Sequence, residues 1–484
     1  MDADRLRQIL APYNPWWVAG AQWKKDLPTY ERPIVREILS DLADLPQAIS
    51  VTGPRRVGKS TAVKQVVGRL IKEQGIDPQR ILYYSFDDPE VFASEENQRK
   101  IFDSLAENRP VKDKTCYFFL DEIQRLPRWE LFIKKYYDLK RPIRFVVSGS
   151  ASSPIFRSSQ ETLLGRIKDR HLLPFSFREY CEYRFHQGEI SVCGSHDFDP
   201  PDTMDLFLGI RNDRLRQALL DGDGETAQRV VMALDERLKP CYGAVTRIVI
   251  EYCLEGGFPE VWALHDPVRK IEYLMEQQIR KVLYEDLMML TPYRKPENVL
   301  RFFLYLLAHP GMEINASRIA KEAGVERRVI EDNLPKLELT DLIMRIRKFS
   351  HQPLRVREGN MKCYPVDMAL RNAVLKTWDW PDQAMMGLYA ENLVMRELAS
   401  WPERIELTYF REKDKEVDFI VTHGGNRYLP IEVKSNADDR ELAGLRLFMK
   451  KFDIDFGVVV TRERSISFEH RVLKLPLRHF LLAV

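Results

Sequence analysis

A run of eight residues contains the clearest chemical signal in the sequence. Residues 53–60 read Gly-Pro-Arg-Arg-Val-Gly-Lys-Ser and fit G-x-x-x-x-G-K-[ST], a loop that surrounds the phosphates of a nucleotide. The two glycines let backbone amides approach the phosphates, and Lys59 adds a full positive charge. The hydroxyl of Ser60 is placed to hold Mg²⁺. The residues predicted to bind ATP are Gly53, Pro54, Arg55, Arg56, Val57, Gly58, Lys59, Ser60 and Thr61.

The segments on either side of this loop have the order that it requires. Residues 48–52 are apolar enough for a short buried strand, and residues 61–72 carry apolar side chains at helical spacing. A helix that begins at the loop directs its partial positive charge at the phosphates. The alternative is an ordinary glycine turn between a strand and a helix, which needs neither the lysine nor the serine.

Two adjacent carboxylates end another apolar segment. Residues 116–122 read Cys-Tyr-Phe-Phe-Leu-Asp-Glu, which predicts a strand that ends in Asp121 and Glu122. The carboxyl ends of strands are where α/β sheets bind their ligands. Asp121 is therefore expected to hold Mg²⁺, directly or through water. Glu122 is expected to orient the water that attacks the nucleotide and to accept its proton.

Two further positions are candidates for the same site. The predicted strand 143–147 is followed by Ser148 and Ser150, of which Ser148 is the first choice for reaching the γ-phosphate. The alternative for either serine is a simple polar turn. Arg166 lies in a loop before a strand predicted at 170–175 and is a candidate arginine finger, acting in its own chain or across a subunit boundary. The alternative for Arg166 is an ordinary surface or ion-pair role.

These motifs together resemble a known family. The runs GPRRVGKST, FFLDEIQRLP, VVSGSASS, LLGRI and LPFSFREY are similar to the prokaryotic AAA-type ATPase domain, which belongs to the P-loop superfamily with an extra strand between the two nucleotide motifs. The resemblance covers residues 46–185. It implies a parallel sheet with helices on both faces, ATP and Mg²⁺ as ligands, and hydrolysis of ATP. The residues that it assigns to the site are Lys59, Ser60, Asp121, Glu122, Ser148 and Arg166.

Length and composition predict an α/β multidomain protein. The chain has 484 residues, a length that suggests about three domains. Its 44% hydrophobic and 30% charged residues are typical of soluble globular proteins. The net charge of +2 gives no overall attraction to nucleic acid, so any basic surface must be local. The charged N-terminus is not a signal peptide, and no apolar run is long enough to cross a membrane. Six dispersed cysteines favour reduced thiols and a cytoplasmic location.

Three other regions are predicted between the motifs. Residues 1–45 form an N-terminal arm with tryptophans that pack on the next domain. Residues 186–295 form a helical insertion followed by a helical lid and connector. Residues 296–360 have the element order of a winged-helix domain, three helices followed by a β-like segment. Its basic segment 342–357 favours contact with DNA phosphates, and docking of a protein is the alternative. The basic residues of this segment are Arg345, Arg347, Lys348, Arg355 and Arg357.

A second acidic constellation lies in residues 385–484, after a predicted linker at 361–384. Asp418 and Glu432 fall on neighbouring predicted strands, where their carboxylates can share a divalent cation, Mg²⁺ or Mn²⁺. Lys434 shares a strand face with Glu432 and can position water. The order of elements, α-β-β-β-α-β, resembles the PD-(D/E)XK nuclease core, a restriction-endonuclease-like α/β domain.

Glu391 matches the acid that the first helix of this nuclease core often carries. The chain departs from the pattern before Asp418, where Val417 stands in place of a proline. Two alternatives remain for this region. Glu432 and Lys434 could be an exposed ion pair on an edge strand, or the fold could be that of a nuclease that no longer cuts.

Two hypotheses for the whole chain follow. The first is a cytoplasmic, Mg²⁺-dependent ATPase that controls a DNA-binding C-terminal region. This hypothesis has two versions, one in which the region only binds DNA and one in which it also cleaves DNA. The second is a nucleotide-controlled switch or scaffold with a winged helix and an inactive nuclease-like tail that bind proteins. Because related ATPases often form rings, a homo-oligomer with Arg166 acting across its interface is compatible with either hypothesis.

Overall fold

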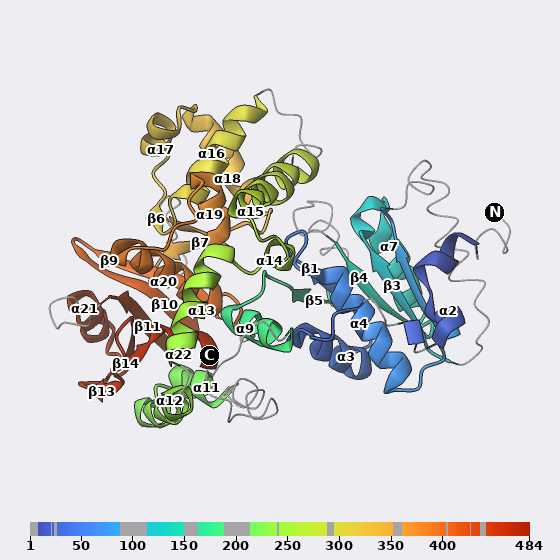
Figure 1. Ribbon diagram of the computed structural model, residues 1–484, viewed down its shortest axis with the longest axis horizontal. Coiled ribbons are helices and arrows are strands. Elements are labelled where there is room, and N and C mark those ends of the chain that lie inside the picture. The colour runs from blue at the N-terminus through green and yellow to red at the C-terminus, as the bar shows by residue number, and fades with distance from the viewer. Residues whose placement is uncertain are drawn as a thin grey trace. The chain divides into compact units, whose positions relative to one another are not determined.

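The computed structural model describes two compact units (Figure 1). Unit 1 comprises Met1–Leu173, Val282–Pro292 and Leu339–Asp341, and unit 2 comprises Pro174–Lys281, Tyr293–Glu338 and Leu342–Val484. The candidate residue Ser150 and the basic residues Arg355 and Arg357 lie outside the described residues. The described residues are 8–20, 22–23, 27–87, 114–149, 163–187, 213–239, 242–287, 295–351, 361–402, 405–425, 427–435 and 442–484.

Unit 1 is built on a five-stranded parallel sheet with the strand order β2-β3-β4-β1-β5. Strand β4 lies between β1, which leads into the phosphate loop, and β3, which ends in Asp121. This is the position of the extra strand that the resemblance implies. The strands are β1 (Ala48–Thr52), β2 (Ile81–Ser85), β3 (Cys116–Asp121), β4 (Ile143–Ser148) and β5 (Ile167–His171).

Strand β5 differs from the strand predicted at 170–175. It begins at Ile167 and ends at His171, because every one of its residues pairs with a residue of β1, from Ala48 to Thr52. The sequence Ile-Lys-Asp-Arg-His has little apolar character and gives no local signal for a strand. Pairing with a buried neighbour therefore decides its bounds.

Helices α3 (Pro33–Asp44) and α4 (Lys59–Lys72) pack on each other and on the sheet, and α7 (Trp129–Asp138) packs on it through a separate core. Phe118 and Leu120 of β3 share a buried cluster with Trp129 of α7. Phe119 lies between them in sequence and is fully buried outside that cluster. Because successive strand residues point to opposite faces, the sheet is covered on both sides.

The N-terminal arm completes the hydrogen bonding of β2, an edge strand of the sheet. The side-chain amide of Asn14 donates to the carbonyl oxygen of Tyr83 at 2.9 Å, and the amide of Tyr83 donates to Asn14 Oδ1 at 2.7 Å. The indole nitrogens of Trp16 and Trp17 both donate to the carbonyl oxygen of Ile81, at 3.1 and 2.8 Å. An unpaired strand edge is a site for unwanted association, and the arm covers this one. The arm contains a 3₁₀ turn (Ala11–Tyr13) and α2 (Trp16–Ala19).

Unit 2 is built on a nine-stranded mixed sheet with the strand order β13-β14-β12-β11-β10-β9-β7-β8-β6. The parallel pairing of β7 with β9 joins the strands of residues 312–365 to those of residues 406–476 in one sheet. The strands are β6 (Met312–Glu313), β7 (Ile343–Lys348), β8 (Met361–Pro365), β9 (Glu406–Glu412), β10 (Lys415–His423), β11 (Arg427–Lys434), β12 (Gly457–Thr461), β13 (Ser467–Glu469) and β14 (Val472–Pro476).

The segment 361–384, predicted as a linker, is instead part of the fold. It contributes β8, which pairs with both β6 and β7, and α19 (Met368–Leu375), nearly all of it buried. Cys363 and Tyr364 are fully buried apolar residues of β8. Burial of these side chains and the backbone pairing of β8 explain why the segment is ordered.

Three helices precede β7, as the sequence predicts, and their assignment to a winged-helix domain stays a prediction. They are α16 (Pro296–Ala308), α17 (Ala316–Ala323) and α18 (Arg327–Glu338). The last helix ends before Leu342, at a turn in which Asp341 has a positive φ of 55°. The other helices before them are α9 (Phe177–His186), α11 (Asp213–Asp221), α12 (Gly224–Leu238), α13 (Tyr242–Glu255), α14 (Pro259–Trp262), α15 (Pro267–Tyr273) and two π-helical segments, Leu274–Arg280 in unit 2 and Val282–Leu287 in unit 1.

The C-terminal strands lie between helices. Side chains of α20 (Gln383–Leu398) and α22 (Leu477–Ala483) share one core with Phe419 and Ile431, whereas α21 (Ala443–Phe452) packs with Val417 and Ile420 in another. The observed order α20-β9-β10-β11-α21-β12 is the α-β-β-β-α-β order that the sequence predicts.

Helix α21 approaches β10 so closely that only glycine fits at Gly444. A Cβ there would lie 2.0 Å from the carbonyl oxygen of Glu416, a backbone atom that cannot move aside. We expect Gly444→Ala to lower the free energy of unfolding of unit 2 by about 1–3 kcal/mol. The measurement is urea unfolding combined with hydrogen exchange in the peptides of β10.

The matched control is Gly243→Ala in α13, where no atom lies within 4 Å of the added Cβ. Since Gly243 is exposed in the first turn of α13, this variant should differ from the wild type by less than about 0.5 kcal/mol. Wild-type stability of the Gly444 variant would show that the helix and the strand are not in close contact.

Candidate functional site

The phosphate loop between β1 and α4 has backbone conformations that favour glycine. Gly53 has a φ of 142° and Gly58 a φ of 94°. A Cβ at Gly53 would lie 2.0 Å from the carbonyl oxygen of Leu172, just after β5. Arg56 also has a positive φ, of 61°. The neighbouring strand and the loop conformation therefore both require the glycine that begins the motif.

The side chain of Lys59 folds back over the loop. Its Nζ donates to the carbonyl oxygens of Gly53 and Pro54, at 2.9 and 2.6 Å, and the residue is buried. Lys59 is also the first residue of α4, so the loop amides and the N-terminal end of the helix face the same region. An ammonium group, loop amides and a helix N-terminus are the groups that bind phosphate.

The carboxylate of Asp121 brings three other predicted site residues together. Ser60 Oγ donates to its Oδ2 at 2.6 Å, and Ser148 Oγ donates to its Oδ1 at 2.5 Å. The backbone amide of Glu122 donates to Oδ1 at 3.1 Å. The hydroxyl and carboxylate oxygens of Ser60 and Asp121 are hard ligands side by side, a donor set that fits Mg²⁺. Ser148 is buried, and its hydroxyl supports Asp121.

Tyr83 is a member of this site that sequence reasoning missed. Its hydroxyl donates to Asp121 Oδ2 at 2.8 Å, from the neighbouring strand β2. Burial and then the charge of Asp121 raise the pKa of Tyr83, so the hydroxyl stays protonated and remains a donor. The apolar run at residues 81–85 is compatible with a strand, but it does not show which strand lies beside Tyr83.

Glu122 has the properties of a general base. Burial raises the pKa of its carboxyl, with a further contribution from the charge of Asp121, and a higher pKa makes a carboxylate a better proton acceptor. The side-chain amide of Gln124 donates to Glu122 Oε2 at 2.5 Å and orients it. The backbone of Glu122 is left-handed, with a φ of 50°, as the chain turns out of β3 into a 3₁₀ turn (Ile123–Arg125).

The structure does not bring Arg166 to the phosphate loop. Its carbonyl oxygen accepts from the amide of Ala48, at the start of β1, whereas the loop follows the end of β1. Five strand residues separate these ends by about 16 Å. Arg166 Nε pairs with Asp138 Oδ1 at 2.8 Å on α7. The prediction that Arg166 acts at the site of its own chain is therefore wrong, and the ion-pair alternative describes what it contacts.

The segment before α3 also holds the loop, which sequence reasoning missed. Arg32 is buried, and its Nη1 donates to the carbonyl oxygen of Val57 at 2.9 Å. The side chain of Gln65, on α4, donates to the carbonyl oxygens of Pro28 and Tyr30 at 3.0 and 2.8 Å. The arm therefore contacts both the phosphate loop and the helix that follows it.

In unit 2, the strand register brings Asp418 and Glu432 together. Phe419 pairs with Ile431 across the antiparallel strands β10 and β11, and an irregularity of register between Val417 and Ile420 includes Asp418. A β-bulge redirects side chains and is common beside functional sites. Asp418 Oδ2 accepts from the amide next to Glu432, that of Val433, at 2.9 Å.

The other predicted residues lie at the same place. Lys434 Nζ pairs with Glu432 Oε1 at 2.7 Å. Glu391, on α20, raises the pKa of Asp418 through its charge and accepts from the hydroxyl of Tyr364 at 2.7 Å. Lys362, on β8, pairs with the same oxygen of Glu391 at 3.3 Å. Lys362 was missed because it lies in the segment predicted as a linker.

The two central carboxylates are buried. Burial, followed by the charge of Glu391, raises the pKa of Asp418 to about 7. Burial and the charge of Asp418 raise the pKa of Glu432. Among the described residues, Glu432 Oε2 has no hydrogen-bond partner, which leaves one buried oxygen available to a ligand. In the described part of the chain, no group of three or more His, Cys, Asp or Glu side chains is arranged to hold a metal ion.

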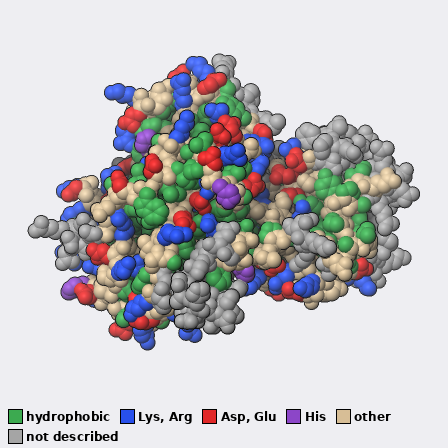
Figure 2. All heavy atoms as spheres, viewed as in Figure 1, with side chains coloured by type: hydrophobic (Ala, Val, Ile, Leu, Met, Phe, Trp, Pro, Cys, Tyr) green, Lys and Arg blue, Asp and Glu red, His purple; other side chains and the backbone are tan. Residues whose placement is uncertain are grey.

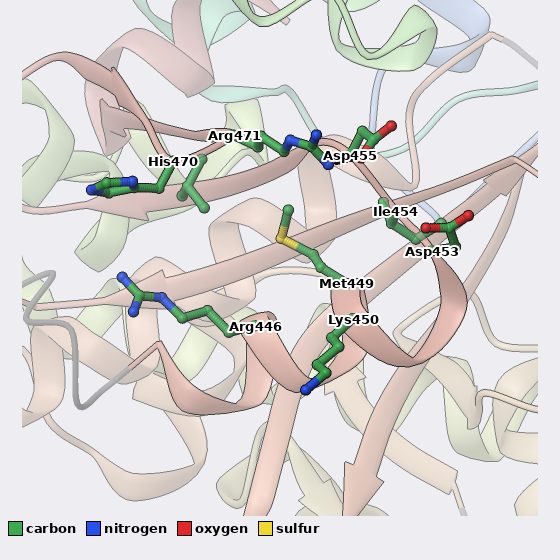
Figure 3. A pocket seen from close by; sticks show the side chains of 9 residues that line it. Arg446, Met449, Lys450, Asp453, Ile454, Asp455, His470 and Arg471 are labelled. Carbon is green, nitrogen blue, oxygen red and sulfur yellow. Dashed lines mark hydrogen bonds and ion pairs between the residues drawn. The ribbon is translucent and has the colours of Figure 1, made fainter.

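A separate pocket of about 520 Å³ lies between α21 and the start of β14 (Figure 3). Arg471 pairs with Asp455 at its rim. Its lining contains none of the predicted site residues. The lining residues are Arg446, Met449, Lys450, Asp453, Ile454, Asp455, His470, Arg471 and Val472.

Comparison with known proteins supports the assignment of unit 1. Residues 46–181 match the family model of the AAA domain. This part of the chain is similar to an AAA-type ATPase domain. Residues 246–379 and 386–480 match two further families, each described as a domain of unknown function. Within the described residues, no helix combines the length and the apolar character needed to cross a membrane.

Several uncharacterized proteins are similar to this chain over most of its length. Two uncharacterized proteins of Methanocaldococcus jannaschii are 22% and 23% identical, and they align with 96% and 85% of this chain and with 91% and 81% of their own lengths. An uncharacterized protein of Haemophilus influenzae is 21% identical over 77% of this chain and 78% of its own. A solved structure of C. elegans PCH-2 is 13% identical, with a TM-score of 0.24, over 41% of this chain and 51% of that chain.

The pKa of Asp418 makes the stability of unit 2 depend on pH. The value of about 7 is above the ordinary 3.8, so the folded state keeps a proton that the unfolded chain releases. The stabilisation is complete below about pH 4 and is lost as the pH rises through 7. In EDTA, we expect the unfolding temperature of unit 2 to fall between pH 5 and pH 8, and to fall less in Asp418→Asn.

Asp453→Asn is the matched control, because Asp453 is exposed on a turn after α21. It should keep the pH dependence of the wild type. An Asp418→Asn protein with the full wild-type slope would contradict the assigned cause.

Proposed function

We propose that this protein binds ATP with Mg²⁺ and hydrolyses it in unit 1. The observation that carries the proposal is the distance of 2.6 Å between Ser60 Oγ, at the start of α4, and Asp121 Oδ2, at the end of β3. It joins the phosphate loop to the paired acids, two motifs that are distant in the sequence. The match to the AAA domain over residues 46–181 supports the same function.

The chain's own groups supply most of the chemistry. The loop amides and Lys59 bind phosphate oxygens, and Ser60 and Asp121 would hold Mg²⁺. When bound, Mg²⁺ neutralises charge on the phosphates. Glu122 orients a water molecule and accepts its proton as the water oxygen attacks the γ-phosphorus and the bond to the bridging oxygen of ADP breaks.

The raised pKa of Glu122 favours this role in proton transfer. Ser148 and Tyr83 keep the carboxylate of Asp121 in place from the two strands that flank β3.

Glu122→Gln should separate binding from hydrolysis. The amide keeps the shape of the side chain but cannot accept the proton, so we expect steady-state turnover to fall about 10²–10⁴-fold while ATP still binds. Lys59→Ala should instead weaken nucleotide binding itself. Phosphate release and binding of a fluorescent ATP analogue measure the two effects.

Glu73→Gln is the control, since this exposed residue follows the far end of α4 and pairs with Arg69. Its turnover should equal that of the wild type. Wild-type hydrolysis by Glu122→Gln would remove Glu122 from the mechanism, and normal ATP binding by Lys59→Ala would contradict the assignment of the loop.

A second proposed function is metal-dependent cleavage of DNA in unit 2, under control of the nucleotide bound to unit 1. Its support is the cluster of Asp418, Glu432, Lys434 and Glu391, which come from two paired strands and a helix. The unpaired buried Glu432 Oε2 fits a divalent cation as ligand. Asp418 and Glu432 would hold this cation, and Lys434 would orient water beside it.

The surface charge gives DNA binding a limited basis. On α18, Arg327 and Arg328 pair with Glu331 and Asp332, so both arginines of this helix have acidic partners. Figure 2 shows basic and acidic side chains interspersed over the visible face. Contacts to DNA would therefore have to come from short local clusters such as Arg347 and Lys348 on β7.

Nicking of supercoiled DNA tests the second function. With Mn²⁺ or Mg²⁺, we expect the wild type to nick the plasmid and Glu432→Gln to lose this activity, because the amide cannot replace a carboxylate ligand. Glu406→Gln is the control, as Glu406 is exposed on β9. It should cut as the wild type does.

Duplex binding at increasing salt separates this function from the scaffold hypothesis. Phosphate contacts release counterions, so DNA affinity should fall steeply with salt. Absence of both nicking and salt-sensitive binding, with ATPase activity intact, would favour a tail that binds proteins.

A further inference from the structure

A buried lysine that no sequence motif predicts lies among the acidic residues of unit 2. Lys362 lies on β8, is only 6% exposed, and its Nζ is 2.5 Å from Glu416 Oε1 and 3.3 Å from Glu391 Oε1. The ring centroid of Tyr409 is 5.4 Å away. A buried ammonium group is stable only with close partners of opposite charge, and Lys362 has two.

Lys362 divides the acidic cluster into two pairs. Glu391 and Glu416 share its ammonium group and have further donors, the hydroxyl of Tyr364 at 2.7 Å and Arg411 Nε at 3.2 Å. These two acids are thus well supplied with protein donors.

The other pair is less well supplied. Asp418 accepts from the amide of Val433, and Glu432 Oε1 pairs with Lys434. Among the described residues, Glu432 Oε2 has no donor. The oxygen available to a metal ion therefore lies beside Asp418 and Glu432. The ammonium group of Lys362 lies instead beside Glu391 and Glu416.

We propose that Lys362 is a built-in cation that takes the place of a second divalent ion and leaves this site one metal position, between Asp418 and Glu432. The inference rests on the second function proposed above, because it concerns the metal of that site. It assigns Lys362 the role of a positioning residue: its ammonium group fixes Glu391 and Glu416 and prevents them from becoming metal ligands.

The charges of the cluster lead to the same result. When all are ionised, five carboxylates face three cations, so the cluster carries two excess negative charges. The carboxylates are those of Asp418, Glu432, Glu391, Glu416 and Glu313, and the cations are Lys362, Lys434 and Arg411. One divalent ion neutralises this excess. A second ion would leave two positive charges in a largely buried site, which is costly. Replacement of Lys362 by a neutral residue removes one positive charge and frees two carboxylates.

Mn²⁺ titration of the full chain followed by electron paramagnetic resonance tests this inference. All proteins carry Asp121→Asn, which weakens the metal site of unit 1. With Lys362 present, we expect one Mn²⁺ ion per chain, lost in Glu432→Gln. In Lys362→Met we expect one additional ion, which Glu391→Gln removes again.

Tyr364→Phe is the matched control. It removes a hydrogen bond to the same oxygen of Glu391 without a change of charge, so it should still bind one ion. Lys362→Gln tests the loss of charge with a polar side chain and should also gain an ion.

The outcomes separate the inference from the function on which it rests. One ion in both the wild type and the folded Lys362 variants would overturn the role of Lys362 and keep the metal site. Absence of any ion that Glu432→Gln removes would overturn both the metal site and the inference.

A second measurement requires no substitution. Anomalous scattering from Mn²⁺-soaked crystals should give one peak within unit 2, between Asp418 and Glu432. A peak at bonding distance from Glu391 would overturn the proposal.

Discussion

The carboxylate of Asp121 joins the elements on which the candidate ATP site depends. It accepts from Ser60 of α4, Tyr83 of β2 and Ser148 of β4, and it lies at the end of β3. Strands β2 and β4 flank β3, so these contacts require the observed strand order. A buried carboxylate with good donors is stable, whereas the same group without them would be costly. The sheet and the site thus stabilise each other.

The sheet topology also explains which sequence motifs meet. Parallel strands place their carboxyl ends at one edge, so the loop after β1 and the acids after β3 lie together even with β4 between them. The same rule places Arg166 at the opposite edge, because it precedes β5 and does not follow it. A residue can therefore reach the ATP site when it follows the carboxyl end of a strand, and not when it precedes the strand. This condition is stricter than closeness in the sequence.

The parts of the site that could be predicted from the sequence are short motifs with a conformation set by their own residues. The loop at 53–60 needs glycine at Gly53 because the backbone of Leu172 leaves no room for a Cβ, and that constraint is local enough to read. The neighbouring strands predicted for Asp418 and Glu432 are likewise present as β10 and β11, which pair antiparallel. The apolar spacing of residues 61–72 likewise predicted a helix, which is α4.

Residues that act through pairing between distant segments could not be found. Tyr83 reaches Asp121 only because β2 happens to pair with β3, and its own segment has no distinguishing pattern. Lys362 lies on β8, a strand of five residues that is ordered by its neighbours β6 and β7. Arg32 reaches the phosphate loop from before α3. Each of these contacts is set by the tertiary fold, and none by local spacing.

The two buried lysines, Lys59 and Lys362, differ in the charge of their partners, and this difference determines whether a ligand can replace those partners. Lys59 donates to the carbonyl oxygens of Gly53 and Pro54, which are neutral acceptors, so phosphate oxygens can replace them with a gain in charge attraction. Lys362 pairs with two carboxylates, and no neutral or anionic ligand offers it a better set. Lys59 can therefore exchange its carbonyl partners for phosphate oxygens when a nucleotide binds. Lys362 keeps its two carboxylate partners. In the unit 2 cluster, a new ligand such as a metal ion would bind at Glu432 Oε2, which has no partner among the described residues.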